Sequence, residues 1–270
     1  MVCLVVTMTL MLGAASGTAP GTTTETPPDT SAPEPLDYLA LGDSLTTGYS
    51  VDKGYVKRYR IRLRKGVDAP VRLTNLGRNG WTSTQLLRAL RKKPRFRRAV
   101  RDAEVVTWRI GTNDLRKARL KYKRGTCGGA DNQECLRRTA RRFRTNWNKV
   151  TRRILFLRAD HDTIIRTATL YNPYVAQDKR QDTWKDDEQL TDFEVLRPYF
   201  HAVNRHIIRT TSKKEIPAAR VYRVFNGRSR SEDPRAKGYI FTDNIHMNLR
   251  GHKIFARLLH KLGYAPLIPE

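Results

Sequence analysis

Residues 36–44 read LDYLALGDS, a short apolar segment that stops at a glycine and continues at once into an aspartate and a serine. Apolar runs of this length that end in turn residues are typical of buried strands. A serine placed directly after such a strand has its hydroxyl and backbone N–H exposed at the edge of the sheet. Taken alone, however, Asp43-Ser44 is more simply explained as the N-cap of a helix.

Downstream of this segment, predicted strands and helices alternate. Strands are expected at residues 71–76, 103–110, 163–170 and 220–225, and helices at 82–91, 134–158, 192–210 and 249–262. The longest helix carries its apolar residues at steps of three or four, as a helix with one buried face does. The alternation predicts an α/β fold with a mainly parallel, five-stranded sheet covered on both faces. In such sheets, ligands bind at the carboxyl ends of the strands.

The second and third predicted strands also end in residues suited to a site. Gly80 lies in the turn after the strand at 71–76, and Asn113 follows the strand at 103–110. A glycine lets the backbone N–H approach a ligand closely, and an asparagine can hold a side-chain amide against a developing oxyanion. A tight turn and an Asx turn would explain the same two residues without any chemistry.

Asp243 precedes His246 by three residues near the C-terminus. On a loop or helical turn, this spacing lets a carboxylate reach the imidazole and fix its tautomer. A lone histidine is more often structural, but this one follows an aspartate and precedes a predicted helix. His201, His206 and His252 are interpreted as structural, because the first two have the wrong spacing to share one helix face. No metal site is predicted.

Together, these segments resemble four sequence blocks of the SGNH (GDSL-type) hydrolase family over about residues 38–256. The matching residues are Gly42-Asp43-Ser44-Leu45, Gly80, Gly111-Thr112-Asn113-Asp114 and Asp243-Asn244-Ile245-His246. Asp43 and Asp114 are expected to support the geometry of their loops. Two residues depart from the family pattern. Met247 stands where many members have proline, and Arg109 lies inside a strand where an apolar residue is commoner. We expect Arg109 either to pair with an acid or to mark a strand edge.

The resemblance implies a flavodoxin-like α/β/α sandwich and a serine ester hydrolase that needs no metal or cofactor. Ser44 would then be the nucleophile, His246 the general base and Asp243 the residue that orients the histidine. The backbone N–H groups of Ser44 and Gly80, with the side-chain amide of Asn113, would form the oxyanion hole. A carboxylesterase or lipase is expected first, and a carbohydrate O-deacetylase or a phospholipase is the alternative.

Residues 1–35 precede the predicted domain and contain no Lys or Arg. Residues 1–12 are almost continuously apolar and small residues follow, which is typical of a signal peptide and too short to span a bilayer. The lack of a basic residue before the apolar run departs from that pattern. We expect a signal peptide at 1–19, a Thr- and Pro-rich linker at 20–35, and a secreted hydrolase domain at 36–270.

Cys127 and Cys135 flank a glycine-rich segment. In an oxidising compartment, two neighbouring cysteines of this kind are expected to form a disulfide, and a pair of free thiols is the alternative. A metal site is disfavoured, because no histidine lies nearby and two ligands would not suffice.

The chain is strongly basic, with 52 Lys and Arg against 26 Asp and Glu and a net charge of +26. Such a surface attracts polyanions and anionic membranes at low salt. The arginines are scattered, without a basic arm or a nucleic-acid-binding motif, so nucleic acid is disfavoured as a partner. The charge is interpreted as a solvated surface or as attraction to anionic lipid or polysaccharide. A monomer acting on a small-molecule, lipid or carbohydrate ester is expected, and a non-catalytic polyanion-binding protein is the alternative from another class.

Overall fold

The computed structural model describes Val2 and residues 34–184 and 190–268. Residues 34–184 and 190–268 belong to one compact unit. Except for Val2 and residues 34–35, the signal peptide expected at 1–19 and the linker expected at 20–35 lie outside the described residues. The elements are β1 (Leu36–Gly42), α1 (Ser44–Thr47), α2 (Tyr55–Val67), β2 (Val71–Asn75), α3 (Ser83–Lys92), α4 (Pro94–Asp102), β3 (Val105–Arg109), α5 (Thr112–Tyr122), α6 (Glu134–Leu157), β4 (Ile164–Ala168), α7 (Val175–Lys179), α8 (Asp192–Ser212), β5 (Ala218–Ala219), α9 (Val221–Asn226) and α10 (Leu249–His260).

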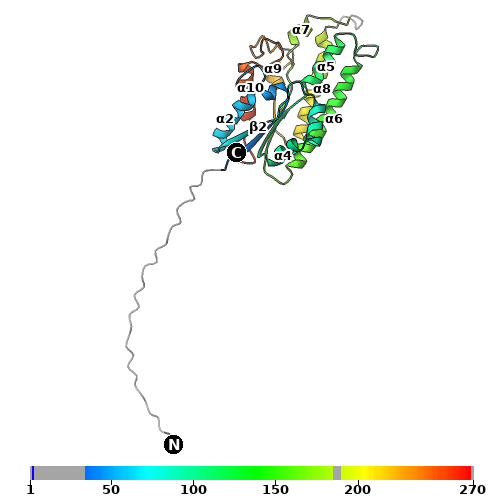
Figure 1. The fold of residues 1–270 in the computed structure, drawn as a ribbon. Coiled ribbons are helices and arrows are strands. Elements are labelled where there is room, and N and C mark those ends of the chain that lie inside the picture. Colours follow the sequence, from blue (N-terminus) through cyan, green and yellow to red (C-terminus); the bar gives the residue numbers. More distant parts are fainter. Residues whose placement is uncertain (1, 3–33, 185–189, 269–270) are drawn as a thin grey trace. The chain divides into compact units, whose positions relative to one another are not determined.

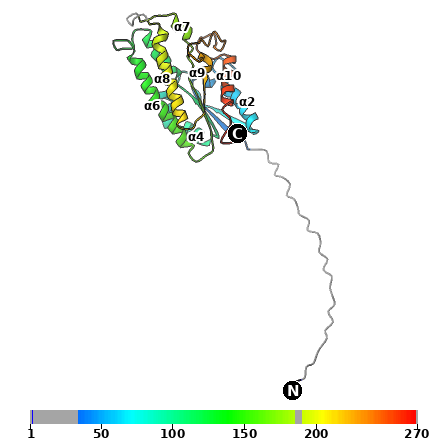
Figure 2. The same cartoon turned by 180° about the vertical axis from the view of Figure 1, so that it is seen from behind.

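The strands form one five-stranded sheet in the order β2-β1-β3-β4-β5. All four pairings are parallel, and β1 lies between β2 and β3. The carboxyl ends of β1, β2 and β3 therefore meet at one edge of the sheet, where the first three predicted site segments begin. Helices cover both faces of the sheet (Figures 1 and 2). The three-layer α/β/α sandwich predicted from the sequence is confirmed.

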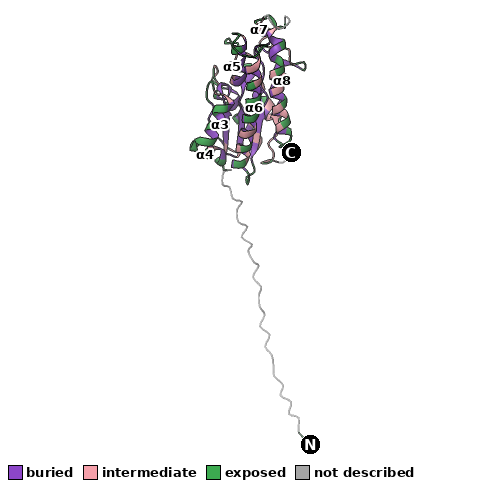
Figure 3. Cartoon of the chain, turned by 90° about the vertical axis from the view of Figure 1, so that its right-hand side faces the viewer, coloured by how far each residue is buried: buried purple, intermediate pink, exposed green. Residues whose placement is uncertain are grey.

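Strand β1 shows how the two helical layers are held. Side chains alternate along a strand, so neighbouring residues point to opposite faces. Leu39 and Leu41 belong to a core cluster with residues of α3, α4, α6 and α8. Tyr38 and Ala40 belong to a second cluster with residues of α2, α9 and α10. All four side chains are fully buried, and Figure 3 shows the buried interior between the exposed outer helix surfaces.

The prediction of a strand at residues 220–225 is wrong. The fifth strand has only two residues, and the chain then forms the helix α9. The segment Val-Tyr-Arg-Val-Phe suits a strand because it is rich in β-branched and aromatic residues. In the fold, Val221, Tyr222 and Phe225 are buried, a spacing that fits a helical turn, and the backbone N–H of Tyr222 donates to Thr169 Oγ1 at 2.9 Å. Tertiary packing thus overrides the local preference at the end of the sheet.

The loop between α5 and α6 is closed by a disulfide between Cys127 and Cys135, as predicted. The side chain of Asn132 lies inside this loop, where it accepts from the backbone N–H of Cys127 and donates to the carbonyl of Tyr122. The disulfide and the asparagine therefore fix the start of the long helix α6. None of the helices in the described residues is both long and apolar enough to cross a membrane.

Candidate active site

Ser44 is the first residue of α1 and lies directly beyond the carboxyl end of β1. Asp43 caps this helix, because its side chain accepts from the backbone N–H of Leu45 at 3.1 Å. Gly42 makes the turn possible. Its φ is +154°, and a Cβ atom at this position would lie 2.3 Å from the carbonyl oxygen of Arg109. The residues before the serine therefore fix where its hydroxyl points.

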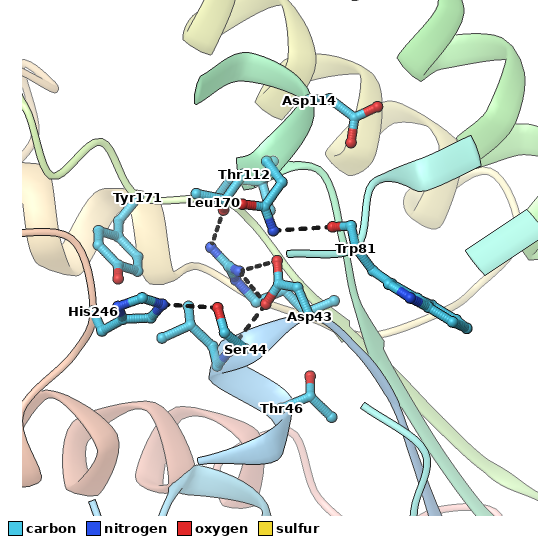
Figure 4. A network of polar contacts seen from close by, with 12 residues as sticks. Asp43, Ser44, Thr46, Trp81, Thr112, Asp114, Leu170, Tyr171 and His246 are labelled. Carbon is cyan, nitrogen blue, oxygen red and sulfur yellow. Dashed lines mark hydrogen bonds and ion pairs between the residues drawn. The ribbon is translucent and has the colours of Figure 1, made fainter. Parts of the chain in front are cut away.

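The structure brings Ser44, His246 and Asp243 together from opposite ends of the chain. The Oγ of Ser44 lies 2.8 Å from Nε2 of His246 (Figure 4). The Nδ1 atom of the same imidazole lies 2.5 Å from Oδ2 of Asp243. A hydroxyl, an imidazole and a carboxylate in this order can activate the hydroxyl as a nucleophile.

Asp243 is held by its own loop. Its Oδ1 accepts from the backbone N–H groups of Ile245 at 3.0 Å and His246 at 2.9 Å. Asn244, between them, adopts a left-handed conformation with φ of 63°. Partial burial of Asp243 favours the neutral acid, but the hydrogen bonds from the two N–H groups and the imidazole outweigh it. The pKa of Asp243 therefore lies below its ordinary value.

Arg109, the last residue of β3, forms a buried ion pair with Asp43 at 3.3 Å. Its other terminal nitrogen donates to Thr112 Oγ1 at 2.7 Å (Figure 4). Burial raises the pKa of Asp43 above its ordinary value, although the Arg109 guanidinium opposes this. Of the two expectations for Arg109, pairing with an acid is confirmed. The edge position is wrong, because β3 lies between β1 and β4.

A tyrosine connects this buried pair to the loop that carries the histidine. The Arg109 guanidinium lies 5.5 Å from the ring centroid of Tyr171. The hydroxyl of Tyr171 donates to the carbonyl of Ile245 at 2.6 Å. Met247, on the other side of the histidine, is fully buried and forms an isolated antiparallel bridge with Ile240. The departure at Met247 is thus accommodated in the core beneath the loop.

Gly80 and Asn113 both line the pocket that contains Ser44. Gly80 has φ of +74°, and a Cβ atom there would meet nothing within 4 Å, so its backbone is open to a ligand. The side-chain amide of Asn113 donates to the carbonyl of Trp81 at 3.0 Å (Figure 4). This bond fixes the orientation of the amide and uses only one of its two hydrogens.

Asp114 holds the turn that carries Gly80. Its carboxylate accepts from the backbone N–H of Ser83 at 2.8 Å and from the Ser83 hydroxyl at 2.7 Å. Burial raises the pKa of Asp114, although both hydrogen bonds from Ser83 oppose this. The start of α5 is thereby tied to the start of α3. The role in loop geometry expected for Asp114 is consistent with these contacts.

The pocket around Ser44 has a volume of about 230 Å³. Its wall includes four residues to which no role was assigned from the sequence, namely Tyr49, Asn79, Arg116 and Ile245. The ring centroid of Tyr49 lies 4.6 Å from that of His246. Arg116 lies one helical turn after Asn113, so the helical spacing in the sequence could have indicated Arg116 as a pocket residue. The other three come from loops, where no periodic pattern identifies a pocket residue.

The remaining histidines lie elsewhere. His252 is fully buried, and its Nδ1 accepts from the backbone N–H of Tyr55 at 3.0 Å. Burial lowers the pKa of His252 to about 3. His206 forms a hydrogen bond with Asn148 Oδ1 at 2.9 Å. Within the described ranges, no three His, Cys, Asp or Glu side chains are grouped so that they could hold a metal ion.

A serine placed against a histidine at the carboxyl ends of a doubly covered parallel sheet is an arrangement that several classes of hydrolase use. Residues 40–254 match the GDSL-like Lipase/Acylhydrolase family, and the chain belongs to that family.

Solved structures of lipases and esterases share this fold. The lipase Lip_vut3 from a goat rumen metagenome is 24% identical, with a TM-score of 0.70 over 86% of this chain and 100% of that chain. A catalytic mutant of Axe2, an acetylxylan esterase from Geobacillus stearothermophilus, is 15% identical, with a TM-score of 0.54 over 87% of this chain and 97% of that chain. TesA is 14% identical, with a TM-score of 0.55 over 86% of this chain and 99% of that chain. A comparison with the curated proteins gives no match.

Proposed function

We propose that the protein is a secreted serine esterase that hydrolyses short-chain carboxylic esters through an acyl-enzyme on Ser44. One observation carries this proposal. The Ser44 hydroxyl lies 2.8 Å from Nε2 of His246, whose Nδ1 lies 2.5 Å from the Asp243 carboxylate. Distances of this size permit direct proton transfer between the serine and the histidine.

In the first half of the reaction, Ser44 Oγ attacks the ester carbonyl while Nε2 of His246 takes the hydroxyl proton. Asp243 accepts a hydrogen bond from Nδ1–H, which keeps Nε2 free to act as a base and stabilises the imidazolium. The lowered pKa of Asp243 supports this role, because the carboxylate stays charged at neutral pH.

The tetrahedral oxyanion would be stabilised by three donors. These are the backbone N–H of Ser44, which as the first helical residue has no intrahelical acceptor, the backbone N–H of Gly80, and the second amide hydrogen of Asn113. All three residues line the same pocket. Removing one such donor costs about 2.7–4 kcal/mol of transition-state stabilisation.

The intermediate collapses when the His246 imidazolium gives its proton to the departing alcohol, which leaves the acyl group on Ser44 Oγ. A water molecule then attacks the acyl carbonyl while His246 takes one of its protons. Return of that proton to Ser44 Oγ releases the carboxylic acid and restores the enzyme. These steps use only the protein groups named above and water.

The pocket supports a short acyl group. Its volume of about 230 Å³ lies below the range of roughly 300–1,000 Å³ that drug-sized ligands occupy. Leu45 and Ile245 supply apolar wall, and Asn79 and Arg116 supply polar wall. These features favour soluble short-chain esters, including O-acetyl groups, over the long acyl chains of phospholipids. The disulfide supports action outside the cytoplasm, since such bonds persist in oxidising compartments.

The test is hydrolysis of p-nitrophenyl butyrate by the purified protein and its Ser44→Ala variant. We expect kcat/KM to fall by about 10⁴-fold or more in Ser44→Ala. The exposed Ser229→Ala variant is the matched control and should retain full activity. A series of esters from acetate to palmitate should show a maximum at short chains. Equal rates in the wild type and Ser44→Ala would overturn the proposal.

A further inference from the structure

A second cavity, of about 1080 Å³, lies against α8 and α9 and the loop that follows α9. It is more than four times as large as the catalytic pocket of 230 Å³ and shares no lining residue with it. Seven arginines line this cavity, here called the arginine cleft: Arg144, Arg205, Arg209, Arg220, Arg223, Arg228 and Arg230.

The positive charge of the arginine cleft is not neutralised by the part of the chain that the structure describes. No Asp or Glu is among its lining residues, and none of the seven arginines is in an ion pair there. By contrast, the buried Arg109 and Arg119 each have a carboxylate partner. Like charges that share a cleft repel one another, and a bound anion relieves this repulsion.

Two polar groups of the cleft also lack partners among the described residues. The hydroxyl of Tyr222 and Nε2 of His201 are buried without a hydrogen bond, and the Tyr222 residue is only 4% exposed. Such groups are rare in folded proteins, because each costs free energy until it is paired. The two rings lie 5.6 Å apart, and the Arg230 guanidinium lies 5.5 Å from the Tyr222 ring. One terminal nitrogen of Arg230 donates to the carbonyls of Gly227 and Arg228, and a ligand oxygen beside the Tyr222 ring would meet the other donors of the guanidinium.

The surroundings of His201 indicate how positive this region is. Burial lowers the pKa of His201, and the positive charges of Arg197, Arg205 and Arg230 lower it further. Burial disfavours a charge of either sign, whereas the contribution of the three arginines shows that the local potential is positive.

We propose that the arginine cleft is a second binding site, which takes a soluble oligoanion carrying two or more phosphate, sulfate or carboxylate groups. Guanidinium groups bind such oxyanions with two parallel hydrogen bonds, and several of them can hold several anionic groups at once. The cleft is concave, and none of the large apolar side chains exposed on the described surface lines it. A membrane-binding surface would present such side chains to the lipid.

The test is calorimetric titration of the full-length protein with inorganic tripolyphosphate at 150 mM NaCl. The test variant is Arg205→Gln/Arg209→Gln, which removes two exposed arginines one turn apart on α8. The control is Arg60→Gln/Arg64→Gln, which removes two exposed arginines with the same spacing on α2. Both variants lose the same charge. We expect about tenfold weaker binding in the first variant and wild-type affinity in the control.

A titration with a sulfated heparin tetrasaccharide distinguishes the sources of the anionic groups. Tighter binding of tripolyphosphate identifies phosphates, tighter binding of the tetrasaccharide identifies a sulfated glycan, and either result supports the site. No binding of either probe, or equal loss in the two variants, overturns it. Binding only to phosphatidylglycerol vesicles also overturns it. Ser44→Ala should bind as the wild type does, so that failure of this proposal and failure of the esterase proposal are distinguishable.

Discussion

Ser44 and His246, the residues proposed as nucleophile and base, are held in different ways. On the nucleophile side, the side chains of Arg109 and Asp43 are 1% and 2% exposed, and they lie within the central strands and the turn that follows β1. On the base side, the side chains of His246 and Asp243 are 17% and 30% exposed, and they lie on a loop. Ser44 is therefore supported by the core, and His246 is supported by hydrogen bonds within its own loop.

This difference separates stability from catalysis. A buried charge that loses its partner destabilises the fold, because it cannot be solvated. A partly exposed carboxylate that loses its charge remains solvated, so the main effect of the loss falls on the reaction. Substitutions on the two sides should therefore be distinguished by which quantity changes, the free energy of unfolding or kcat.

The largest effect is expected for Asp243→Asn. The asparagine oxygen can still accept from the backbone N–H groups of Ile245 and His246, so the loop should keep its shape. Its NH2 group would replace the oxygen that faces Nδ1 and would donate to that nitrogen, which moves the imidazole proton to Nε2. The histidine then cannot accept the proton of Ser44. We expect kcat for p-nitrophenyl butyrate to fall by about 10⁴-fold.

The control for this prediction is Asp160→Asn, an exposed aspartate in the turn after α6, which should leave kcat unchanged. Urea denaturation should give the Asp243→Asn variant nearly the wild-type free energy of unfolding. A variant that unfolds much more easily but retains its kcat would reverse the assignment of the two sides.

A smaller effect, on stability, is expected for Arg109→Met. The methionine leaves Asp43 buried without its cation and removes the donor to Thr112. Since the guanidinium opposes the effect of burial, its loss should raise the pKa of Asp43 further. Breaking a buried pair in this way costs about 3–5 kcal/mol. Urea denaturation at neutral pH measures this loss in the free energy of unfolding.

Two further variants identify the cause. Arg72→Met breaks an ion pair with Asp37, in which the two side chains are 65% and 33% exposed, and it should change the denaturation midpoint little. In the double variant Asp43→Asn/Arg109→Met, the asparagine still caps α1 but carries no charge. This double variant should recover part of the lost stability. No recovery would mean that the cost comes from packing and not from the unpaired charge.

The sequence could indicate which residues lie together because the candidate residues follow the ends of strands. In the order β2-β1-β3, the segments carrying Ser44, Gly80 and Asn113 leave adjacent strands, so a parallel sheet alone brings them together. The Asp-x-x-His spacing similarly places Asp243 and His246 on one turn. These predictions needed only the element types and the resemblance to the family. Neither of these depends on the exact residue at which an element begins or ends.

Other features depend on contacts between segments far apart in the chain. The partner of Arg109 lies at the end of a neighbouring strand, so the sequence left pairing and an edge position equally open. The arginine cleft draws its charges from α6, α8 and the region around α9, where no local pattern sets them apart from the other arginines. The strand predicted at 220–225 failed for a related reason, because the core determines the conformation of that segment.

His252 contacts elements of both sides. Its substitution should have the smallest effect on stability, and this effect should be seen only at acidic pH. It lies on α10, which follows the His246 loop, and its Nδ1 accepts from Tyr55 N–H at the start of α2, which follows the nucleophile helix. Burial, and then nearby positive charge, lowers the pKa of His252 to about 3 in the folded protein. In the unfolded chain the ordinary value is about 6.5, so the unfolded state binds a proton that the folded state rejects.

The free energy of unfolding should therefore decrease as the pH falls below about 6.5. The contribution of His252 to this decrease should end near pH 3, where the folded protein also binds the proton. For one histidine this amounts to about 2 kcal/mol between pH 8 and pH 5. His252→Gln keeps an oxygen that can accept from Tyr55 N–H but does not titrate, so its urea denaturation should depend less on pH by that amount. The exposed His161→Gln variant should follow the wild type. If His252→Gln loses stability in acid as steeply as the wild type, the link between the two sides does not depend on a neutral, buried imidazole.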